Sequence, residues 1–340
     1  MPYFIGTSIV INDSSAYVHE SFSSTGIGTT YIKISKPVGD SGDYFGHAVS
    51  VGSQKIVVGA WDDFSDGSAH IYDLDGSNEV KITASDGSSF DNFGYSVSVG
   101  CGKIVIGAYG DNFDQGSVYI YDLDGSNEVK ITASDISSGD SFGYSVAVDN
   151  GRIVVGAPFD DVNAGNSGSI YIFDLYGNQL HKIVDPDGLS GNYFGISVAV
   201  GSGRIVAGAT EQGRTNLLTG GKAHIFDLEG DNRIEIQGTD IDAEDNFGIT
   251  VSVASGKIIV GANNKNPNAV YVFDLNGNQL NKISAPDSAE DIFSQSCAIS
   301  DGKIVIGDHS QNTNNGAAFI FDYPEDSNTY WETIMDTYKY

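Results

Sequence analysis

The stretch FGYSVSVGCGKIVIGA at residues 93–108 decides the fold, because each of its parts recurs along the chain. It contains a Phe-Gly pair, an alternating run, a short glycine turn and a β-branched run that ends in Gly-Ala. Period-two alternation and runs rich in Val and Ile, bounded by glycine, are typical of β-strands. The stretch therefore predicts two antiparallel strands joined by a tight turn.

The Phe-Gly pair returns at spacings of 48, 49, 52, 53 and 46 residues, with Phe-Ser in the last copy. The six copies begin at Phe45, Phe93, Phe142, Phe194, Phe247 and Phe293. In each unit the β-branched run is followed by a variable polar loop and an aromatic strand such as SVYIYDL (117–123). A tight turn then leads to a fourth strand such as NEVKIT (127–132) in most units. Four short strands repeated about every 50 residues predict an all-β propeller of four-stranded antiparallel blades.

The segment IYDLDGSNEVKITASD occurs twice without a difference, at residues 71–86 and 120–135. Its DLDG part resembles the start of a calcium loop, but no Glu follows at the twelfth position. An Asp-Gly pair between two strands is first of all a hairpin turn. We interpret the segment as a building block, the outer half of a blade, and place the candidate site in the loops that vary.

The Phe-Gly start and the Gly-Ala-Pro end of the second strand, literal in GAPFDD (156–161), resemble FG-GAP repeats. The resemblance covers roughly residues 30–322 and is specific in five of six copies. FG-GAP repeats build the propeller of integrin α-chains and occur in many microbial and phage proteins, so the resemblance implies blades of four strands. Calcium-binding copies carry an Asp-x-Asp-x-Asp-Gly-type loop between the first two strands. Here that connection is a tight turn, as in VGCGKI (99–104), so the family's calcium sites are not carried over.

The number of blades depends on how the ring closes. We favour six blades, with the strand at 29–35 (TTYIKIS) supplying the fourth strand that the last repeat lacks, because closure removes exposed sheet edges. In the alternative, NTYWETI (328–334) is that fourth strand and the N-terminal strands form part of a seventh blade. The predicted division is an N-terminal arm or partial blade (1–28), a propeller (29–322) and a C-terminal tail (323–340).

Composition narrows the class of partner. The chain of 340 residues carries a formal net charge of −28, which argues against nucleic-acid binding and against docking on an anionic membrane. No apolar run approaches the length that spans a bilayer, and the start MPYFIGTSIVINDSS lacks the regions of a secretory signal. Two cysteines, Cys101 and Cys297, lie in different repeats and are expected to be separate free thiols.

The loops after the second strands are the main candidates for recognition, because variable loops on a constant scaffold usually carry it. Their candidate ligand-binding residues are Trp61, Asp62, Asp63, Asp66, Tyr109, Asp111, Asp114, Phe159, Asp160 and Asp161. Asp, Asn and Gly also simply make polar turns, and no loop has the spacing of a cation site. We therefore predict no metal and no cofactor, and Ca²⁺ at the Asp pairs has no motif to support it.

Basic residues recur at two positions of the repeat. The first, at the start of the second strand, forms a basic ring of Lys55, Lys103, Arg152, Arg204, Lys257 and Lys303. The second, in the fourth strand, holds Lys33, Lys81, Lys130, Lys182 and Lys282, with Glu235 and the nearby Arg233 breaking the series. A ring of cations near the axis is able to bind an anion or an acidic partner. More often such residues pair with nearby Asp, and exposed pairs contribute only about 0–1 kcal/mol.

These patterns favour a non-enzymatic propeller. The six histidines are scattered, and no HExxH or nucleophile-elbow pattern is present, so no catalytic residue is predicted. The expected role is a phage virion component, such as a tail fibre, appendage or capsid-associated protein, that contacts other proteins of its assembly and a host-surface glycan or protein. The alternatives are an extracellular or cell-surface adhesin and, less favoured, a carbohydrate-active enzyme.

Overall fold

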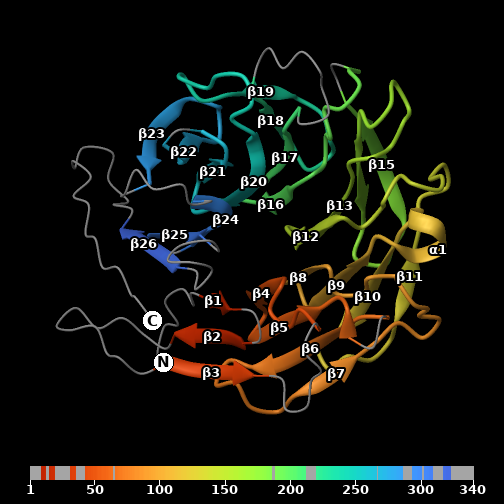
Figure 1. Cartoon of the computed structure of the whole chain (residues 1–340). Helices are drawn as coiled ribbons and strands as arrows, with labels where there is room; N and C mark the ends of the chain where they lie inside the picture. Colours follow the sequence, from red (N-terminus) through yellow and green to blue (C-terminus); the bar gives the residue numbers. More distant parts are fainter. Residues whose placement is uncertain are drawn as a thin grey trace.

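The computed structural model describes residues 9–12, 15–19, 31–35, 43–63, 66–185, 188–211, 220–265, 267–285, 293–300, 302–308 and 317–322. The chain is an all-β, six-bladed propeller, and Figure 1 shows its sheets arranged around a central axis. Each of the six Phe-headed repeats forms one blade, so the predicted fold class and the preference for six blades are confirmed.

Blades 1 to 5 are four-stranded antiparallel sheets in which consecutive strands are neighbours, and blade 6 has three described strands. Blade 1 contains β4 (Val49–Gly52), β5 (Lys55–Ala60), β6 (Ser68–Asp73) and β7 (Val80–Ile82). Blade 2 contains β8 (Ser96–Gly100), β9 (Lys103–Ala108), β10 (Ser117–Asp122) and β11 (Val129–Ile131). Blade 3 contains β12 (Ser145–Asp149), β13 (Arg152–Ala157), β14 (Ser169–Phe173) and β15 (Gln179–Val184).

The remaining blades follow the same order. Blade 4 contains β16 (Val198–Gly201), β17 (Arg204–Ala209), β18 (Lys222–Phe226) and β19 (Ile234–Ile236). Blade 5 contains β20 (Phe247–Ala254), β21 (Lys257–Ala262), β22 (Ala269–Asp274) and β23 (Gln279–Ser284). Blade 6 contains β24 (Phe293–Ser300), β25 (Lys303–Asp308) and β26 (Ala317–Asp322). The first strands of the blades contact one another in turn and lie nearest the axis (Figure 1).

The hydrophobic core consists of clusters that each lie between two adjacent sheets. Between blades 2 and 3, for example, Val118 and Ile131 pack against Phe142 and Tyr171, and Phe142 and Tyr171 are fully buried. The second strands are buried along almost their whole length, which explains why they read as continuous Val/Ile runs. Each repeat therefore buries its apolar faces only against its neighbours in the ring.

The recurring glycines have a steric cause at the blade junctions. Gly143, of the Phe-Gly pair in blade 3, has φ +90, and its amide donates to the carbonyl of Gly156 in the same blade. A Cβ on Gly107, in the Gly-Ala pair of blade 2, would lie 2.0 Å from the Gly143 carbonyl oxygen. The two glycine positions of the repeat thus let adjacent backbones touch, and a side chain at Gly107 would separate the blades.

Serines of the first strands connect neighbouring blades by hydrogen bonds. Ser96 Oγ donates to the carbonyl of Gly143 at 2.8 Å, and Ser98 Oγ accepts from the amide of Val148 at 3.0 Å. These small side chains near the crowded axis therefore also satisfy backbone groups of the next blade.

The N-terminal strands form a sheet of their own, which corrects the predicted closure. β1 (Ile9–Asn12), β2 (Ser15–His19) and β3 (Tyr31–Ser35) pair in the order β1-β2-β3, so β3 bonds to β2 rather than to β26 of blade 6. Pairing with a strand close in sequence costs less loop-closure entropy than pairing with one almost 300 residues away. Ile34 of β3 is buried against Phe45 and Tyr72 of blade 1, so this sheet packs beside the first blade. The alternative fourth strand at 328–334 lies outside the described residues.

One short helical segment, α1 (Asp111–Asp114), lies in the loop of blade 2, and its interior is left-handed. Asn112, Phe113 and Asp114 have φ values of 53, 62 and 59, which L-residues adopt at a cost of roughly 1–2 kcal/mol each. Among the described residues no helix is long and apolar enough to cross a membrane.

Candidate functional site

Strand direction divides the propeller into two faces. The loops between the second and third strands and the links between blades lie on one face, which we call the loop face. The hairpins between the third and fourth strands and the short turns between the first and second strands lie on the other, the hairpin face. The loop face carries the sequence variation and all ten candidate loop residues.

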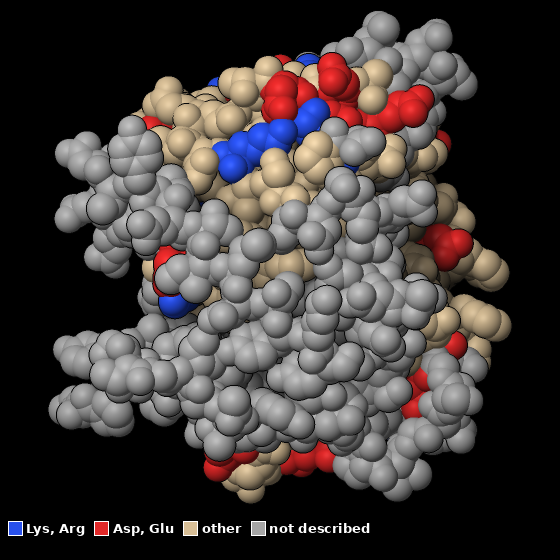
Figure 2. Space-filling view, turned by 60° about the vertical axis from the view of Figure 1, so that its left-hand side comes forward, with Lys and Arg blue, Asp and Glu red and all other residues tan. Residues whose placement is uncertain are grey.

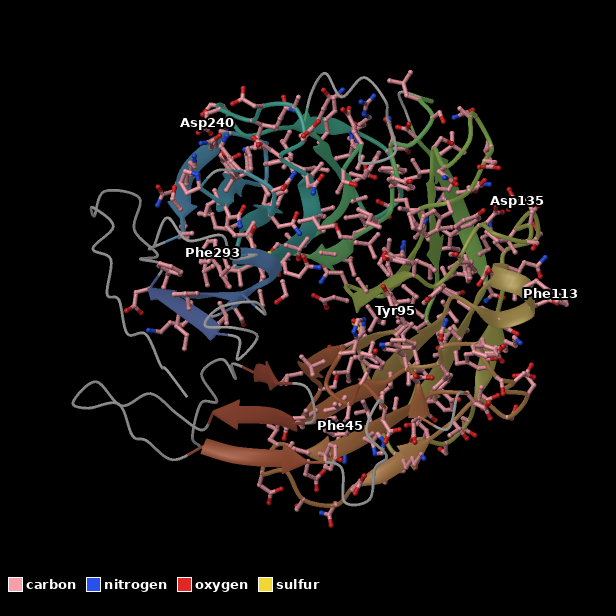
Figure 3. The ribbon with its side chains drawn as sticks, viewed as in Figure 1. Phe45, Tyr95, Phe113, Asp135, Asp240 and Phe293 are labelled. Atoms are coloured by element: carbon pink, nitrogen blue, oxygen red, sulfur yellow. The ribbon has the colours of Figure 1, made fainter. Side chains whose placement is uncertain are left out.

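An aromatic stripe runs across the loop face from blade 1 to blade 4. It consists of Tyr44, His47, Trp61, Tyr95, Tyr109, Tyr144, Phe159 and Tyr193, and adjacent members have ring centroids 4.5–6.3 Å apart. The ring of Tyr95 contacts the ring of Tyr109 in its own blade at 4.5 Å and the ring of Tyr144 in blade 3 at 5.0 Å. Figure 3 places Tyr95 near the centre of the propeller, so the stripe lies close to the propeller axis. Offset and edge-to-face pairs at these distances contribute about 0.5–1.5 kcal/mol beyond burial.

The stripe remains partly open to solvent. Tyr44 is 50% exposed, and the rings of Trp61, Tyr109 and Phe159 are half-buried. Trp61 Nε1 is buried and finds no hydrogen-bond partner among the described residues. Burial raises the pKa of Tyr95, and the neighbouring Tyr144 adds to this, so the phenol stays neutral.

Sequence reasoning found three of these aromatic residues and missed the rest. Trp61, Tyr109 and Phe159 belong to the candidate loops, and the structure brings them together through rings that follow the Phe-Gly pairs. The missed residues are His47, Tyr95 and Tyr144 directly after Phe-Gly, and Tyr44 and Tyr193 two positions before its glycine. The available signal was an aromatic ring directly after Phe-Gly in three units and a tyrosine directly before the Phe in two.

The buried loop carboxylates pair with the fourth-strand lysines of their own blades. Asp63 lies 2.6 Å from Lys81, Asp111 lies 2.6 Å from Lys130, and Asp160 lies 2.9 Å from Lys182. The lysines of blades 2 and 3 also pair with a second carboxylate, that of Asp86 and Asp135. Figure 3 places Asp135 and the comparable Asp240 at the periphery of the ring.

Hydroxyl groups complete these ion pairs. Ser68 donates to Asp63 at 2.6 Å, and Tyr171 donates to Asp160 at 3.2 Å. These contacts occupy Asp63, Asp111 and Asp160 within the fold, so they join the loop to the blade that carries it.

The other candidate carboxylates lie closer to solvent. Asp114 and Asp161 are exposed, and Asp161 accepts from the amide of Asn166 at 2.6 Å. Asp62 is half-buried, and Asp66 lines a pocket between the β5–β6 loop and the link that follows β7. The structure therefore separates the ten candidates into stripe aromatics, structural carboxylates and accessible carboxylates.

The predicted basic ring lies on the hairpin face, where its described members contact acidic side chains or backbone carbonyls. Lys55 and Lys103 pair at 2.5 Å with Asp73 and Asp122, the residues that end the third strands of their blades. Lys303 pairs with Asp322 in the same way. The two arginines reach the next blade instead, Arg152 to the carbonyl of Leu228 and to Glu229, and Arg204 to the carbonyl of Leu275. Figure 2 likewise shows basic and acidic side chains adjacent on the described surface.

The hairpin of the duplicated segment serves packing. Gly125, in the DLDG turn of blade 2, has φ +82, and a Cβ there would lie 2.9 Å from Ile82 of blade 1. Asp122 of the same turn accepts from Lys103 at 2.5 Å and from Asn127 at 2.6 Å. The turn thus contacts the preceding blade and closes its own hairpin.

The site offers apolar contact more than chemistry. Among the described residues, no three His, Cys, Asp or Glu side chains gather as a metal site. The loop carboxylates nearest the core already accept from lysine and hydroxyl groups, whereas the stripe presents ring surfaces. An extended, partly exposed aromatic surface is the kind of feature from which binding interfaces gain most of their energy.

Comparison with known proteins agrees with the geometry. The FG-GAP repeat family matches the chain at residues 30–72, 77–121, 126–173 and 178–226. No curated protein matches the chain in sequence. Among solved structures, the crystal structure of the WD40 β-propeller domain of Doa1 is similar, with a TM-score of 0.59 and 13% identity over 94% of this chain and 90% of that one. At this identity the likeness concerns the fold alone.

Proposed function

The chain belongs to the FG-GAP repeat family, whose matches cover more than half of its length, and from this we propose that it is a non-enzymatic binding propeller. The proposal assigns binding to the aromatic stripe on the loop face of blades 1–4. The observation that carries it is the continuity of the stripe across three blade junctions, from Tyr44 in blade 1 to Tyr193 in blade 4.

The stripe lies outside the clusters that form the hydrophobic core. The core clusters lie deeper between the sheets and contain none of the stripe's members among their buried residues. Large rings left partly exposed, such as Tyr44, add apolar surface that water solvates poorly. A partner that covers these rings gains that surface, which supports a binding role.

A binding role is favoured over catalysis because of how the acids are used. A general acid or base must be free to reach the reacting group. Asp63, Asp111 and Asp160 instead accept hydrogen bonds or ion pairs from their own blades. This supports the prediction that the chain is not an enzyme and favours a binding role over the carbohydrate-active alternative.

The finer part of the proposal places the chain in a phage virion, where it would contact other proteins of the particle and a host surface. Its support is the occurrence of such propellers in phage proteins and the close similarity of the first and second units, which share the unchanged segment at 71–86 and 120–135. An extracellular or surface adhesin that binds glycan or protein is the alternative. Mass spectrometry of purified particles tests the placement, and absence of the chain from them would reject it.

Site-specific photocrosslinking tests the binding face. A benzophenone amino acid replaces Tyr109 in the stripe and, as the matched control, Tyr176, which is 80% exposed in a hairpin of the other face. We expect crosslinks in the native assembly from position 109 and none from position 176. Crosslinks from position 176 alone, or equally from both, would overturn the assignment.

A further inference from the structure

Two blades carry a buried histidine at a position of the third strand where three other blades carry tyrosine. His70 in β6 and His224 in β18 are 2% and 1% exposed. The tyrosines at the same register with the fourth strand are Tyr119, Tyr171 and Tyr271. A buried imidazole must satisfy its ring nitrogens inside the fold, so its hydrogen bonds indicate which of them carry protons. The two histidines differ in this respect.

His70 is the middle of a chain of three hydrogen bonds that runs from a loop to a hairpin. Its Nδ1 lies 2.7 Å from Glu79 Oε1, in the hairpin before β7, and its Nε2 lies 3.1 Å from Ser68 Oγ. Ser68 Oγ donates to Asp63 Oδ2, in the β5–β6 loop, at 2.6 Å. Ser68 and His70 are both buried, so neither side chain can turn to solvent for a partner.

This chain needs one more proton than its neutral side chains supply. Each of the three contacts needs one hydrogen, and the carboxylates at the two ends only accept. Lys81 lies 2.6 Å from Asp63 and keeps that carboxylate ionised, so the hydrogen between Asp63 and Ser68 belongs to the hydroxyl. A neutral imidazole supplies a second hydrogen, and the third must be an added proton. Because histidine has an ordinary pKa of about 6.5 and glutamate one of about 4.3, the added proton resides on the imidazole.

The equivalent histidine of blade 4 has the opposite arrangement. Arg233 stands in its hairpin where blade 1 has Glu79, and Arg233 Nε donates to His224 Nδ1 at 3.2 Å. A guanidinium has no acceptor, so Nδ1 of His224 is without a proton whatever the other ring nitrogen contacts. The hydrogen-bond counts of the two histidines therefore differ by one proton.

Burial opposes a charge on His70, and several neighbours favour it. Burial lowers the pKa of His70 and the charge of Lys81 lowers it further, whereas the hydrogen bond and charge of Glu79 and the charge of Asp63 raise it. These groups come from β7, the hairpin and the β5–β6 loop, and the Phe45 ring packs edge-on against the imidazole at 5.2 Å. The hydrogen-bond count decides between these effects, because a contact of 2.7 Å is typical of an imidazolium that donates to a carboxylate.

We propose that His70 holds a proton at neutral pH and that this proton completes a tie between the β5–β6 loop and blade 1. Without it two hydrogens remain for three contacts, and the single hydroxyl hydrogen of Ser68 then serves either His70 or Asp63. Because the folded chain holds the proton more tightly than the unfolded chain, the tie is complete below about pH 6.5 and is lost as the pH rises further. The loop also carries Trp61, so only the effect of the proton on a ligand of the stripe rests on the proposed function.

Nuclear magnetic resonance of the full chain with isotopically labelled histidine tests the proposal, because proton–nitrogen correlations distinguish the imidazolium from both neutral forms. His70→Gln and His224→Gln identify the two signals. At about pH 7.5 we expect the imidazolium for His70 and a neutral ring with a bare Nδ1 for His224. Glu79→Gln removes the anionic end of the chain, and the proton affinity of His70 should fall at least about tenfold. Glu128→Gln, at the same hairpin position of blade 2, is the matched control and should leave that affinity unchanged.

Two further measurements separate the hydrogen-bond chain from a simple ion pair. Ser68→Ala removes one contact and keeps both carboxylates, and the proton affinity of His70 should still fall several-fold. The amide of Gly67 donates to the Asp63 carbonyl at 3.0 Å, and it should exchange with solvent several-fold faster in Glu79→Gln than in the control variant at the same pH.

Three results would overturn the proton chain. They are a neutral His70 at about pH 7.5, a proton affinity unchanged in Glu79→Gln, and a proton affinity unchanged in Ser68→Ala. Equal exchange of the Gly67 amide in both hairpin variants would overturn the tie to the loop.

Discussion

Replacing Lys182 by methionine should destabilise the propeller much more than the same change at Lys103. Lys182 joins the loop of blade 3 to its fourth strand through Asp160 at 2.9 Å and reaches Asp135 at 2.6 Å. Methionine keeps most of the aliphatic stem and removes the ammonium, so the change isolates the charge.

The magnitude follows from burial. The side chains of Lys182 and Asp160 are 15% and 4% exposed, and removing one partner of a buried pair costs about 3–5 kcal/mol. Tyr171 and the amide of Val162 still donate to Asp160, at 3.2 and 3.0 Å, which places the expected loss near the lower limit, about 3 kcal/mol. The exposed pair with Asp135 adds at most about 1 kcal/mol.

Urea unfolding followed by far-ultraviolet circular dichroism measures the difference. The control Lys103 lies in a pair whose side chains are 25% and 37% exposed, so its replacement should cost no more than about 1 kcal/mol. Adding Asp160→Asn to Lys182→Met should recover part of the loss, because the uncompensated buried charge disappears. Equal losses at both lysines, or no recovery in the double variant, would contradict the structural role given to the loop carboxylates.

Three further outcomes are expected. Gly107→Ala should cost about 1–3 kcal/mol, because its Cβ would lie 2.0 Å from a backbone oxygen of the next blade, whereas Gly165→Ala, with no atom closer than 3.5 Å, should be neutral in the same unfolding assay. The hydrogen bond from a lysine of the next blade lowers the pKa of Asp86 below its ordinary 3.8, so its contribution to stability is present above about pH 4 and is lost as the pH falls further; Asp86→Asn should weaken the acid dependence of the melting temperature. Burial raises the pKa of the half-buried Cys297 thiol to about 12 while Cys101 is exposed, so a thiol reagent at about pH 8 should label Cys101 much faster than Cys297 in the folded chain; equal labelling rates would contradict this difference.

Much of the fold can be predicted from the sequence because every repeat has the same strand pattern and the same Phe-Gly start. The period of the Phe-Gly pairs and the β-branched runs predict the blades, since each unit packs only on its neighbours. The partner of the strand at 31–35 is not readable in this way, because its alternating residues suit the edge of either terminal sheet. Local pairing with β2 decided it.

Part of the candidate site could likewise be predicted from the sequence. Residue type and position single out Trp61, Tyr109 and Phe159, but only the ring geometry shows that Tyr95 and Tyr144 connect them. Whether a loop carboxylate faces solvent or a lysine depends on distances across a blade, and no spacing in the chain encodes those.

The glycine in the hairpin between the third and fourth strands limits which substitutions a blade tolerates. Gly125 rests on Ile82, Ile71 and Val80 of the preceding blade, and Gly177 rests on the matching residues Ile131, Ile120 and Val129. A substitution in one hairpin must therefore suit the neighbouring unit as well as its own. Copying a whole unit avoids that conflict, because the new unit brings a surface that already fits both sides. The two identical segments are the form that growth by copying would leave, and the loops remain free to diverge afterwards.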